Sequence, residues 1–168
     1  HNVYLNDISP DGKKLLCSTS KPDITRCPFS LSSLFEIDLT TLQADTLVAW
    51  DAYLGSASYS PDGKQLLVTG SPSAFGGIGK NCGEHPIAND FDTQAFIMDL
   101  ATKKVQAITR DFNPTVSPVQ WNRVDGCIYF DTTDGDCRHI YRYVPKTGGF
   151  EMLPLEEDVI TSFTLAND

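Results

Sequence analysis

A short phrase occurs twice in the chain and constrains the fold more than any other feature. Residues 9–17 read Ser-Pro-Asp-Gly-Lys-Lys-Leu-Leu-Cys, and residues 60–68 read Ser-Pro-Asp-Gly-Lys-Gln-Leu-Leu-Val. Residues 122–130 form a third copy of the same length, in which the Asp-Gly pair is displaced by one residue. Repetition of one phrase within a single chain is typical of an architecture assembled from similar units.

The phrase has the composition of a turn between two antiparallel strands. Proline presets φ at the second position of a type I turn, aspartate bonds nearby backbone groups, and glycine accepts a positive φ. Such a turn predicts a three-residue hairpin loop with a bulge. We therefore expect a hairpin around each copy, with the apolar pair that follows the turn on the second strand.

A second phrase follows each copy of the first. It reads Leu-Phe-Glu-Ile-Asp-Leu-Thr-Thr at 34–41, Ala-Phe-Ile-Met-Asp-Leu-Ala-Thr at 95–102 and Ile-Tyr-Arg-Tyr-Val-Pro-Lys-Thr at 140–147. Each is an apolar strand that ends in a turn and leads to another strand, so each unit holds four strands in series. The predicted units cover about residues 3–50, 55–110 and 116–154, and a fourth unit begins within 158–168 with a strand at Val159–Phe163.

Four-stranded units repeated in this way predict the blades of a β-propeller. The expected fold is all-β: a partial β-propeller of about three four-stranded antiparallel blades plus the first strand of a fourth, in one domain over residues 1–168. A β-sandwich of short strands is the alternative, and the fixed order of the two phrases favours the propeller. Because closed propellers have about four to eight blades, the end blades should present unmatched apolar faces, through which the chain could self-associate.

Composition limits the possible partners. The net charge of −9 would repel a phosphate backbone, so nucleic acid is not an expected partner. No apolar run in the sequence is long enough for a transmembrane helix. The chain begins at His1 without an initiator methionine, and we expect it to be a segment of a longer protein.

The five cysteines are too few for a disulfide scaffold. Cys27 and Cys82 lie in corresponding loops of neighbouring units, so a bridge between them is one hypothesis. In the last hairpin we expect Cys137 to lie opposite Thr132 rather than opposite Cys127, and therefore no bridge there.

The sequence holds no pattern that predicts catalysis. A serine hydrolase of the α/β class needs Gly-x-Ser-x-Gly, and the nearest approach, residues 55–59, lacks the final glycine. Residues 76–80 lack the spacing of a phosphate-binding loop. Cys82, Glu84 and His85 are too few to predict a metal site without further ligands elsewhere. We expect no catalytic residue, no cofactor and no metal in this chain.

Two long loops that depart from the repeat are the candidates for binding. One contains Arg26, and the other, a glycine-rich insertion, contains Phe75, Lys80 and His85. Each joins the second and third strands of its unit, so both should emerge at the same end of the blades as the connections between blades. The repeated turns should emerge at the opposite end. Loops on a rigid scaffold commonly carry function, so we expect the interaction surface at the loop end and only a structural role for the turn end.

The pairing of Ser-Pro-Asp-Gly-Lys with Asp-Leu-x-Thr resembles the propeller repeats of TolB-like proteins. It is also similar to the N-terminal propeller of the prolyl oligopeptidase and dipeptidyl peptidase IV group of serine peptidases. The resemblance covers about residues 3–154, and the irregular spacing between phrases is closer to the peptidases. The third copy departs from the pattern, because Asn122-Arg123-Val124 replaces Ser-Pro.

The peptidase resemblance implies a non-catalytic propeller segment of a periplasmic or secreted protein. It would restrict the access of peptide substrates to the protein's own C-terminal α/β-hydrolase domain, which lies outside this chain. Relatives hold the substrate amino terminus with paired glutamates, which makes Glu156 and Glu157 candidates for that role. The alternatives are a TolB-like periplasmic module that binds proteins without an attached enzyme, and a propeller enzyme whose active site uses loops of other blades.

Overall fold

The computed structural model describes residues 2–83, 90–112 and 114–166, and in these it has three separate four-stranded antiparallel sheets. The first sheet contains β1 (Asn2–Ile8), β2 (Lys14–Pro22), β3 (Ser30–Asp38) and β4 (Ala44–Asp51). The second contains β5 (Leu54–Tyr59), β6 (Gln65–Gly70), β7 (Gln94–Asp99) and β8 (Val105–Ala107). The third contains β9 (Val116–Trp121), β10 (Ile128–Asp134), β11 (Cys137–Val144) and β12 (Gly149–Met152).

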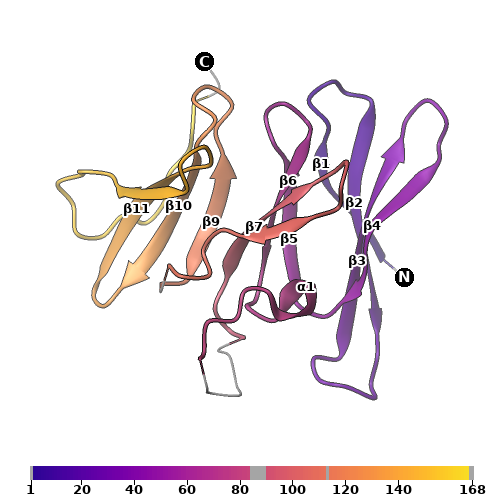
Figure 1. Cartoon of the computed structure of the whole chain (residues 1–168), viewed down its shortest axis with the longest axis horizontal. Helices are drawn as coiled ribbons and strands as arrows, with labels where there is room; N and C mark the ends of the chain where they lie inside the picture. The colour runs from indigo at the N-terminus through magenta and orange to yellow at the C-terminus, as the bar shows by residue number, and fades with distance from the viewer. Residues whose placement is uncertain (1, 84–89, 113, 167–168) are drawn as a thin grey trace.

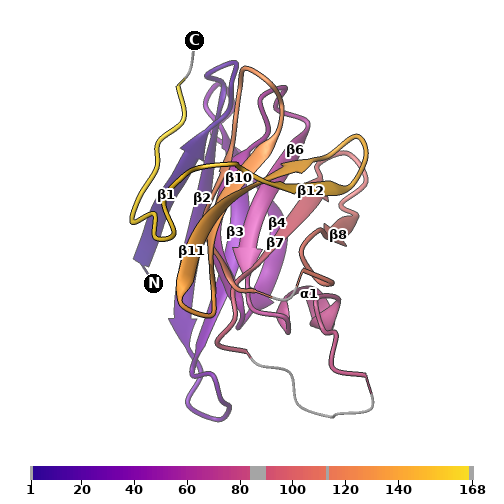
Figure 2. The same cartoon turned by 90° about the vertical axis from the view of Figure 1, so that its left-hand side faces the viewer.

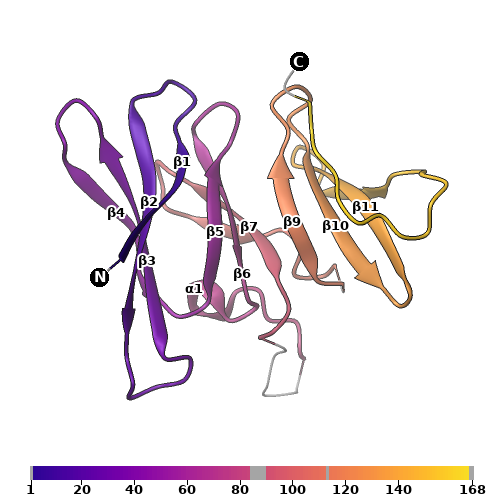
Figure 3. The same ribbon diagram turned by 180° about the vertical axis from the view of Figure 1, so that it is seen from behind.

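Within each sheet the strands lie in chain order, as expected for propeller blades. Figure 1 shows the three blades side by side, with the first and third blades at opposite ends of the row, and Figure 3 shows the same order from behind. The sheets do not close into a ring. The predicted partial β-propeller of about three blades is therefore confirmed.

Each repeated turn closes its hairpin over the same span of chain. Ser9 N donates to Lys14 O at 2.9 Å, and Ser60 N donates to Gln65 O at 2.8 Å. In the third copy Asn122 N donates to Cys127 O at 2.8 Å, although its Asp-Gly pair is displaced. The span is the same in all three copies. The hairpin is defined by the first residue of each turn and its closing partner, and not by the position of the Asp-Gly pair.

The hairpin loop holds four residues, not the three expected. Gly12 N donates to Ser9 O at 2.8 Å, as in a type I turn with a positive φ of 70° at Gly12. Lys14 N donates to the Ser9 hydroxyl at 2.9 Å instead of to the Ser9 carbonyl. The serine side chain therefore replaces one ladder hydrogen bond and lengthens the loop.

The apolar pair that follows the turn serves two blade interfaces at once. Leu66 belongs to a buried cluster that includes Leu16 and Leu34 of the first blade. Leu67 belongs to another buried cluster, which includes Ile128 and other residues of the third blade. Neighbouring strand residues point to opposite faces of a sheet, so two adjacent leucines connect the middle blade to both of its neighbours.

The last hairpin of the third blade differs in register from the prediction. Cys137 lies opposite Asp134, and Thr132 lies opposite His139. Gly135, with a φ of 64°, is the first of two residues between Asp134 and Cys137. A glycine that accepts positive φ permits this tight two-residue turn, which extends both strands beyond the predicted ends.

The strand predicted at residues 159–163 is not formed, apart from one parallel bridge between Val159 and Arg138. Residue 160 nevertheless contacts the third blade in the same way that the start of β9 contacts the second blade. Ile160 N donates to Arg138 O at 3.1 Å, and Val116 N donates to Thr93 O at 3.0 Å. A strand is assigned only where a segment has ladder partners, and among the described residues this segment has one only at Val159.

The insertion between β6 and β7 is more ordered at its start than a glycine-rich surface loop. It contains α1 (Ala74–Gly77), a single turn in which Phe75 has a φ of 53°. Ala74 is fully buried, and the Phe75 ring packs on the Phe96 ring with their centroids 5.1 Å apart. Gln94 Nε2 also donates to Gly79 O at 2.9 Å. Within the described residues, no helix is long and apolar enough to cross a membrane.

Candidate binding site at the loop end

The long loops gather at one end of the blades, which we call the loop end. Figures 1 and 2 show α1, at the start of the insertion, at the same end as the β2–β3 loop, with the β1–β2 and β5–β6 hairpins at the opposite end. This arrangement follows from the alternation of strand direction, because the second and third strands of a blade meet at the end away from the first hairpin. The long loops and the repeated hairpins therefore lie at the ends of the blades at which the sequence predicted them.

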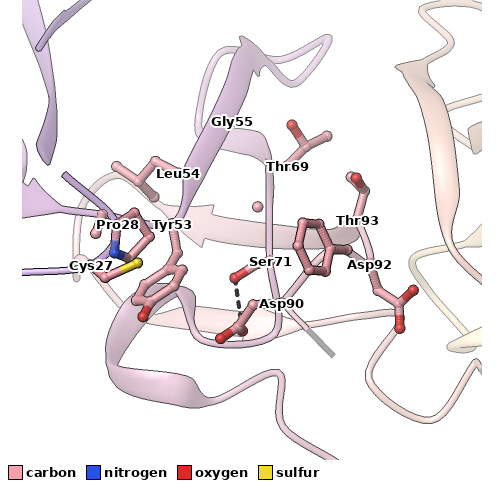
Figure 4. A pocket seen from close by; sticks show the side chains of 13 residues that line it. Cys27, Pro28, Tyr53, Leu54, Gly55, Thr69, Ser71, Asp90, Asp92 and Thr93 are labelled. Carbon is pink, nitrogen blue, oxygen red and sulfur yellow. Dashed lines mark hydrogen bonds between the residues drawn. The ribbon is translucent and has the colours of Figure 1, made fainter. Parts of the chain in front are cut away.

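A cavity of about 640 Å³ opens at the loop end between the first and second blades. Four chain segments line it: the β2–β3 loop, the β4–β5 connection, the end of β6 and the end of the insertion (Figure 4). The lining residues are Cys27, Pro28, Ala52, Tyr53, Leu54, Gly55, Thr69, Gly70, Ser71, Asp90, Phe91, Asp92 and Thr93. A volume of this size accommodates a side chain or a small molecule.

One carboxylate ties the blade connection that lines the cavity to the start of the insertion. Asp51 Oδ1 accepts a hydrogen bond from Tyr53 N at 2.8 Å, and its Oδ2 accepts one from Phe75 N at 2.7 Å. The blade connection and α1 are therefore tied to the same side chain at the end of β4. Since the Phe75 ring also packs on Phe96, the start of the insertion is held by both polar and apolar contacts.

Gly70 permits a close approach of backbone beside the cavity. Ser71 N donates to Tyr53 O at 3.0 Å, which draws the blade connection against the end of β6. A Cβ atom at residue 70 would lie 2.7 Å from Tyr53 O and 3.1 Å from the Ala74 Cβ. A larger residue would therefore push the connection away from β6 and change the shape of the cavity.

The polar lining is acidic. Asp90 and Asp92 are the two charged side chains among the described lining residues, and Ser71 Oγ donates to Asp90 Oδ1 at 3.2 Å. Figure 4 shows Asp90 and Ser71 meeting beside Tyr53, with Cys27 and Pro28 on the other side of Tyr53. Aromatic surface from Tyr53 and Phe91 adjoins the carboxylates, and Phe91 is fully exposed.

The structure places the residues predicted for the interaction surface differently from one another. Arg26 and Lys80 are exposed at the loop end but do not line the cavity. Phe75 is turned toward Phe96 and belongs to the scaffold under the cavity rather than to its wall. His85 lies outside the described residues.

The candidate glutamates for substrate anchoring lie elsewhere. Glu156 and Glu157 are exposed in the irregular segment after β12, and neither lines the cavity. The structure therefore does not bring them together with the acidic residues Asp90 and Asp92.

Sequence reasoning missed most of the lining residues, among them Tyr53, Ser71, Asp90 and Asp92. A usable signal was present, because each lies just before or just after a predicted strand at the loop end. Residues at strand ends converge when neighbouring sheets are stacked, whereas the middle of a long loop extends away from the stack.

All five cysteines are unpaired in the structure, so it does not form the hypothesised Cys27–Cys82 bridge. Cys27 is exposed at the cavity, whereas Cys17 and Cys127 are buried. Burial raises the pKa of the Cys17 and Cys127 thiols above the usual value. Among the described residues, no group of three or more histidine, cysteine, aspartate or glutamate side chains could hold a metal ion.

Known structures share this fold. TolB from Acinetobacter baumannii matches with a TM-score of 0.63 and 22% identity, over 94% of this chain and 33% of that one. The β-propeller domain of the Trilobed protease from Pyrococcus furiosus matches with a TM-score of 0.60 and 21% identity, over 94% and 44%. Acylaminoacyl peptidase from Pyrococcus horikoshii matches with a TM-score of 0.55 and 16% identity, over 90% and 25%.

These similarities concern the fold. No family model matches the sequence, and no curated protein matches it. The chain spans about a quarter to a half of the length of the three structures. It therefore has the blades of a TolB-like propeller, an architecture that occurs both in TolB and in peptidases.

Proposed function

We propose that this chain is a non-catalytic propeller segment of a periplasmic or secreted serine peptidase of the prolyl oligopeptidase class. In this proposal its loop end shapes the access of peptides to a hydrolase domain elsewhere in the same protein. The observation that carries the proposal is the gathering of the non-repeating loops and a cavity of about 640 Å³ at one end of the blades. The similarity in fold to the β-propeller domain of the Trilobed protease and to acylaminoacyl peptidase supports it.

The division of labour between the two ends also supports this role. At the turn end the prolines, aspartates and glycines of the repeated phrase are used in hairpin closure. A cavity of about 460 Å³ also lies at this end, lined in part by residues of the same turns. At the loop end Asp90, Asp92 and Tyr53 line the cavity of about 640 Å³. The loop end therefore has the larger of these two cavities, and it lies on loops, where binding residues are commonly placed.

The complete protein tests the proposal directly. Incubation with a fluorophosphonate probe, followed by mass spectrometry, should label one serine outside residues 1–168. Shortening the insertion within 76–83 should raise the relative rate on large peptides over small ones, because the entrance becomes wider. Absence of any labelled serine in the complete protein would overturn the proposal.

A TolB-like module that binds proteins without an attached enzyme is the second candidate function. The observation that favours it is the match to TolB, which covers 94% of this chain with a TM-score of 0.63. Under this proposal the complete protein carries no probe-reactive serine, and the loop end captures a protein partner. The labelling experiment therefore separates the two candidates.

A further inference from the structure

We infer that the loop-end cavity binds a cationic side chain, lysine or arginine, of a peptide. The inference rests on the proposed function in one respect, because it assumes that peptides meet the loop end. It goes beyond that function by assigning the chemical class of ligand that the cavity selects. Asp90, Asp92, Tyr53 and Phe91 carry the assignment.

The charged residues around the cavity favour a cationic ligand. Among its described residues, the lining contains two carboxylates and no lysine, arginine or histidine. Asp90 is held in place by the Ser71 hydroxyl, at 3.2 Å. A hydroxyl neutralises none of the aspartate's charge, so an anionic ligand would be repelled and a cationic one attracted.

The apolar part of the lining also suits a lysine or arginine side chain, independently of charge. Pro28, Ala52, Tyr53, Leu54 and Phe91 bring apolar surface into the same cavity. Lysine and arginine have long apolar stems below a charged head, and they bury the stem while the head stays polar. Aromatic rings also attract such cations through their negative faces. A cavity with both aromatic walls and carboxylates matches these side chains better than it matches a metal ion or an inorganic cation.

The wall of the cavity that contains Tyr53 is held rigidly. Asp51 ties the blade connection that carries Tyr53 to α1 through hydrogen bonds of 2.8 and 2.7 Å. Ser71 N binds Tyr53 O at 3.0 Å on the other side. The wall that contains Tyr53 is thus fixed from two directions before a ligand arrives, which lowers the entropy that binding must offset.

Binding of matched peptides to the 168-residue chain tests the inference. The probes are acetyl-Ala-Ala-X-Ala-Ala-amide peptides with X as lysine, arginine, norleucine or glutamate, so that the central side chain carries the whole charge difference. Calorimetry at low ionic strength should show the lysine and arginine peptides binding about tenfold more tightly than the norleucine peptide. The glutamate peptide should bind more weakly than all three, and added salt should reduce the preference.

Asp90→Asn and Asp92→Asn should each remove most of the preference for lysine over norleucine. Asp136→Asn is the matched control, since it removes one exposed carboxylate in the β10–β11 hairpin without touching the cavity. Equal affinities for lysine and norleucine peptides, a preference unchanged in both cavity variants, or no binding of any peptide would overturn the inference. These outcomes leave the serine-labelling result unchanged, so failure of the inference and failure of the proposed function are distinguishable.

Discussion

Tyr59 Oη donates a hydrogen bond to Glu36 Oε1 at 2.8 Å across the boundary between the first and second blades. Lys14 Nζ lies 3.0 Å from the other oxygen of the same carboxylate. Glu36 faces Leu16 in its sheet, as Ile97 faces Leu67 in the next blade. An acidic side chain therefore occupies, at the first boundary, the position that isoleucine fills at the second.

Removing the Tyr59 hydroxyl should lower the stability of the fold more than removing an exposed tyrosine hydroxyl. In Tyr59→Phe the buried Glu36 loses a donor, so we expect the free energy of unfolding to fall by about 1–3 kcal/mol. Tyr4→Phe is the control, because Tyr4 is exposed and should change stability by less than about 0.5 kcal/mol. Urea unfolding followed by tryptophan fluorescence measures both. Equal stabilities of the two variants would show that the contact does not stabilise the boundary.

Lowering the pH should destabilise the folded state, because aspartates in the turns become protonated. The hydrogen bond from the Ser60 hydroxyl, together with that from Lys64 N, lowers the pKa of Asp62 below its usual value of 3.8. The folded state therefore favours the ionised form, so this stabilisation is present above pH 3.8 and is lost as the pH falls through the lower folded pKa. Turn hydrogen bonds lower the pKa of Asp11, Asp38 and Asp99 in the same direction.

Asp62→Asn should reduce this dependence on pH. We expect the urea midpoint of the variant to fall less than that of the original chain between pH 6 and pH 3, because asparagine cannot be protonated there. Asp136→Asn, which lies outside the repeated turns, is the comparison. A steeper acid loss in Asp62→Asn than in the original chain would contradict the assignment.

The start of the insertion should contribute to stability as well as to the cavity. Phe96→Ala removes a fully buried ring and should cost about 3–5 kcal/mol. Phe75→Ala removes the half-buried ring that packs on it and should cost roughly 1–3 kcal/mol. Phe29→Ala should have little effect, because Phe29 is 63% exposed. If Phe75→Ala were as mild as Phe29→Ala in urea unfolding, the insertion would not be anchored as described.

The chain on its own should self-associate through the open face of the first blade. Leu66 and Ile128 are fully buried against the preceding blade, whereas Leu15, which occupies their position, is half-exposed. Leu5 on the neighbouring strand is 60% exposed. Leu5→Lys should therefore shift the population toward monomer in multi-angle light scattering, while Leu42→Lys at an exposed turn should not. A clean monomer of the original chain at high concentration would contradict the expectation.

All five thiols should react without prior reduction. In denaturant, alkylation with and without reductant should give the same mass, because all five cysteines are unpaired. Under native conditions Cys27 should react before Cys17 and Cys127, since burial shields those two and raises their pKa. A mass difference equal to two alkyl groups would instead establish one disulfide.

The strands and hairpins could be predicted because their causes are local. Ser9, Asp11 and Gly12 bond to groups within a few residues of themselves, so the repeated phrase forms its turn wherever it occurs. The register of β10 and β11 was predicted wrongly because both a longer and a shorter turn can be drawn around Gly135. The position of glycine alone does not decide which residues close the hairpin.

The sequence by itself determined the blades, their order and the end at which the long loops emerge, because period-two alternation and short turns act between near neighbours. Only the tertiary structure decided that Phe75 packs on Phe96, that Glu36 meets Tyr59 between blades, and that Tyr53, Ser71, Asp90 and Asp92 surround one cavity. These residues are far apart in the chain or lie in segments without a repeating pattern. Their meeting depends on how the sheets stack, and stacking depends on the packing of whole faces rather than on any local motif.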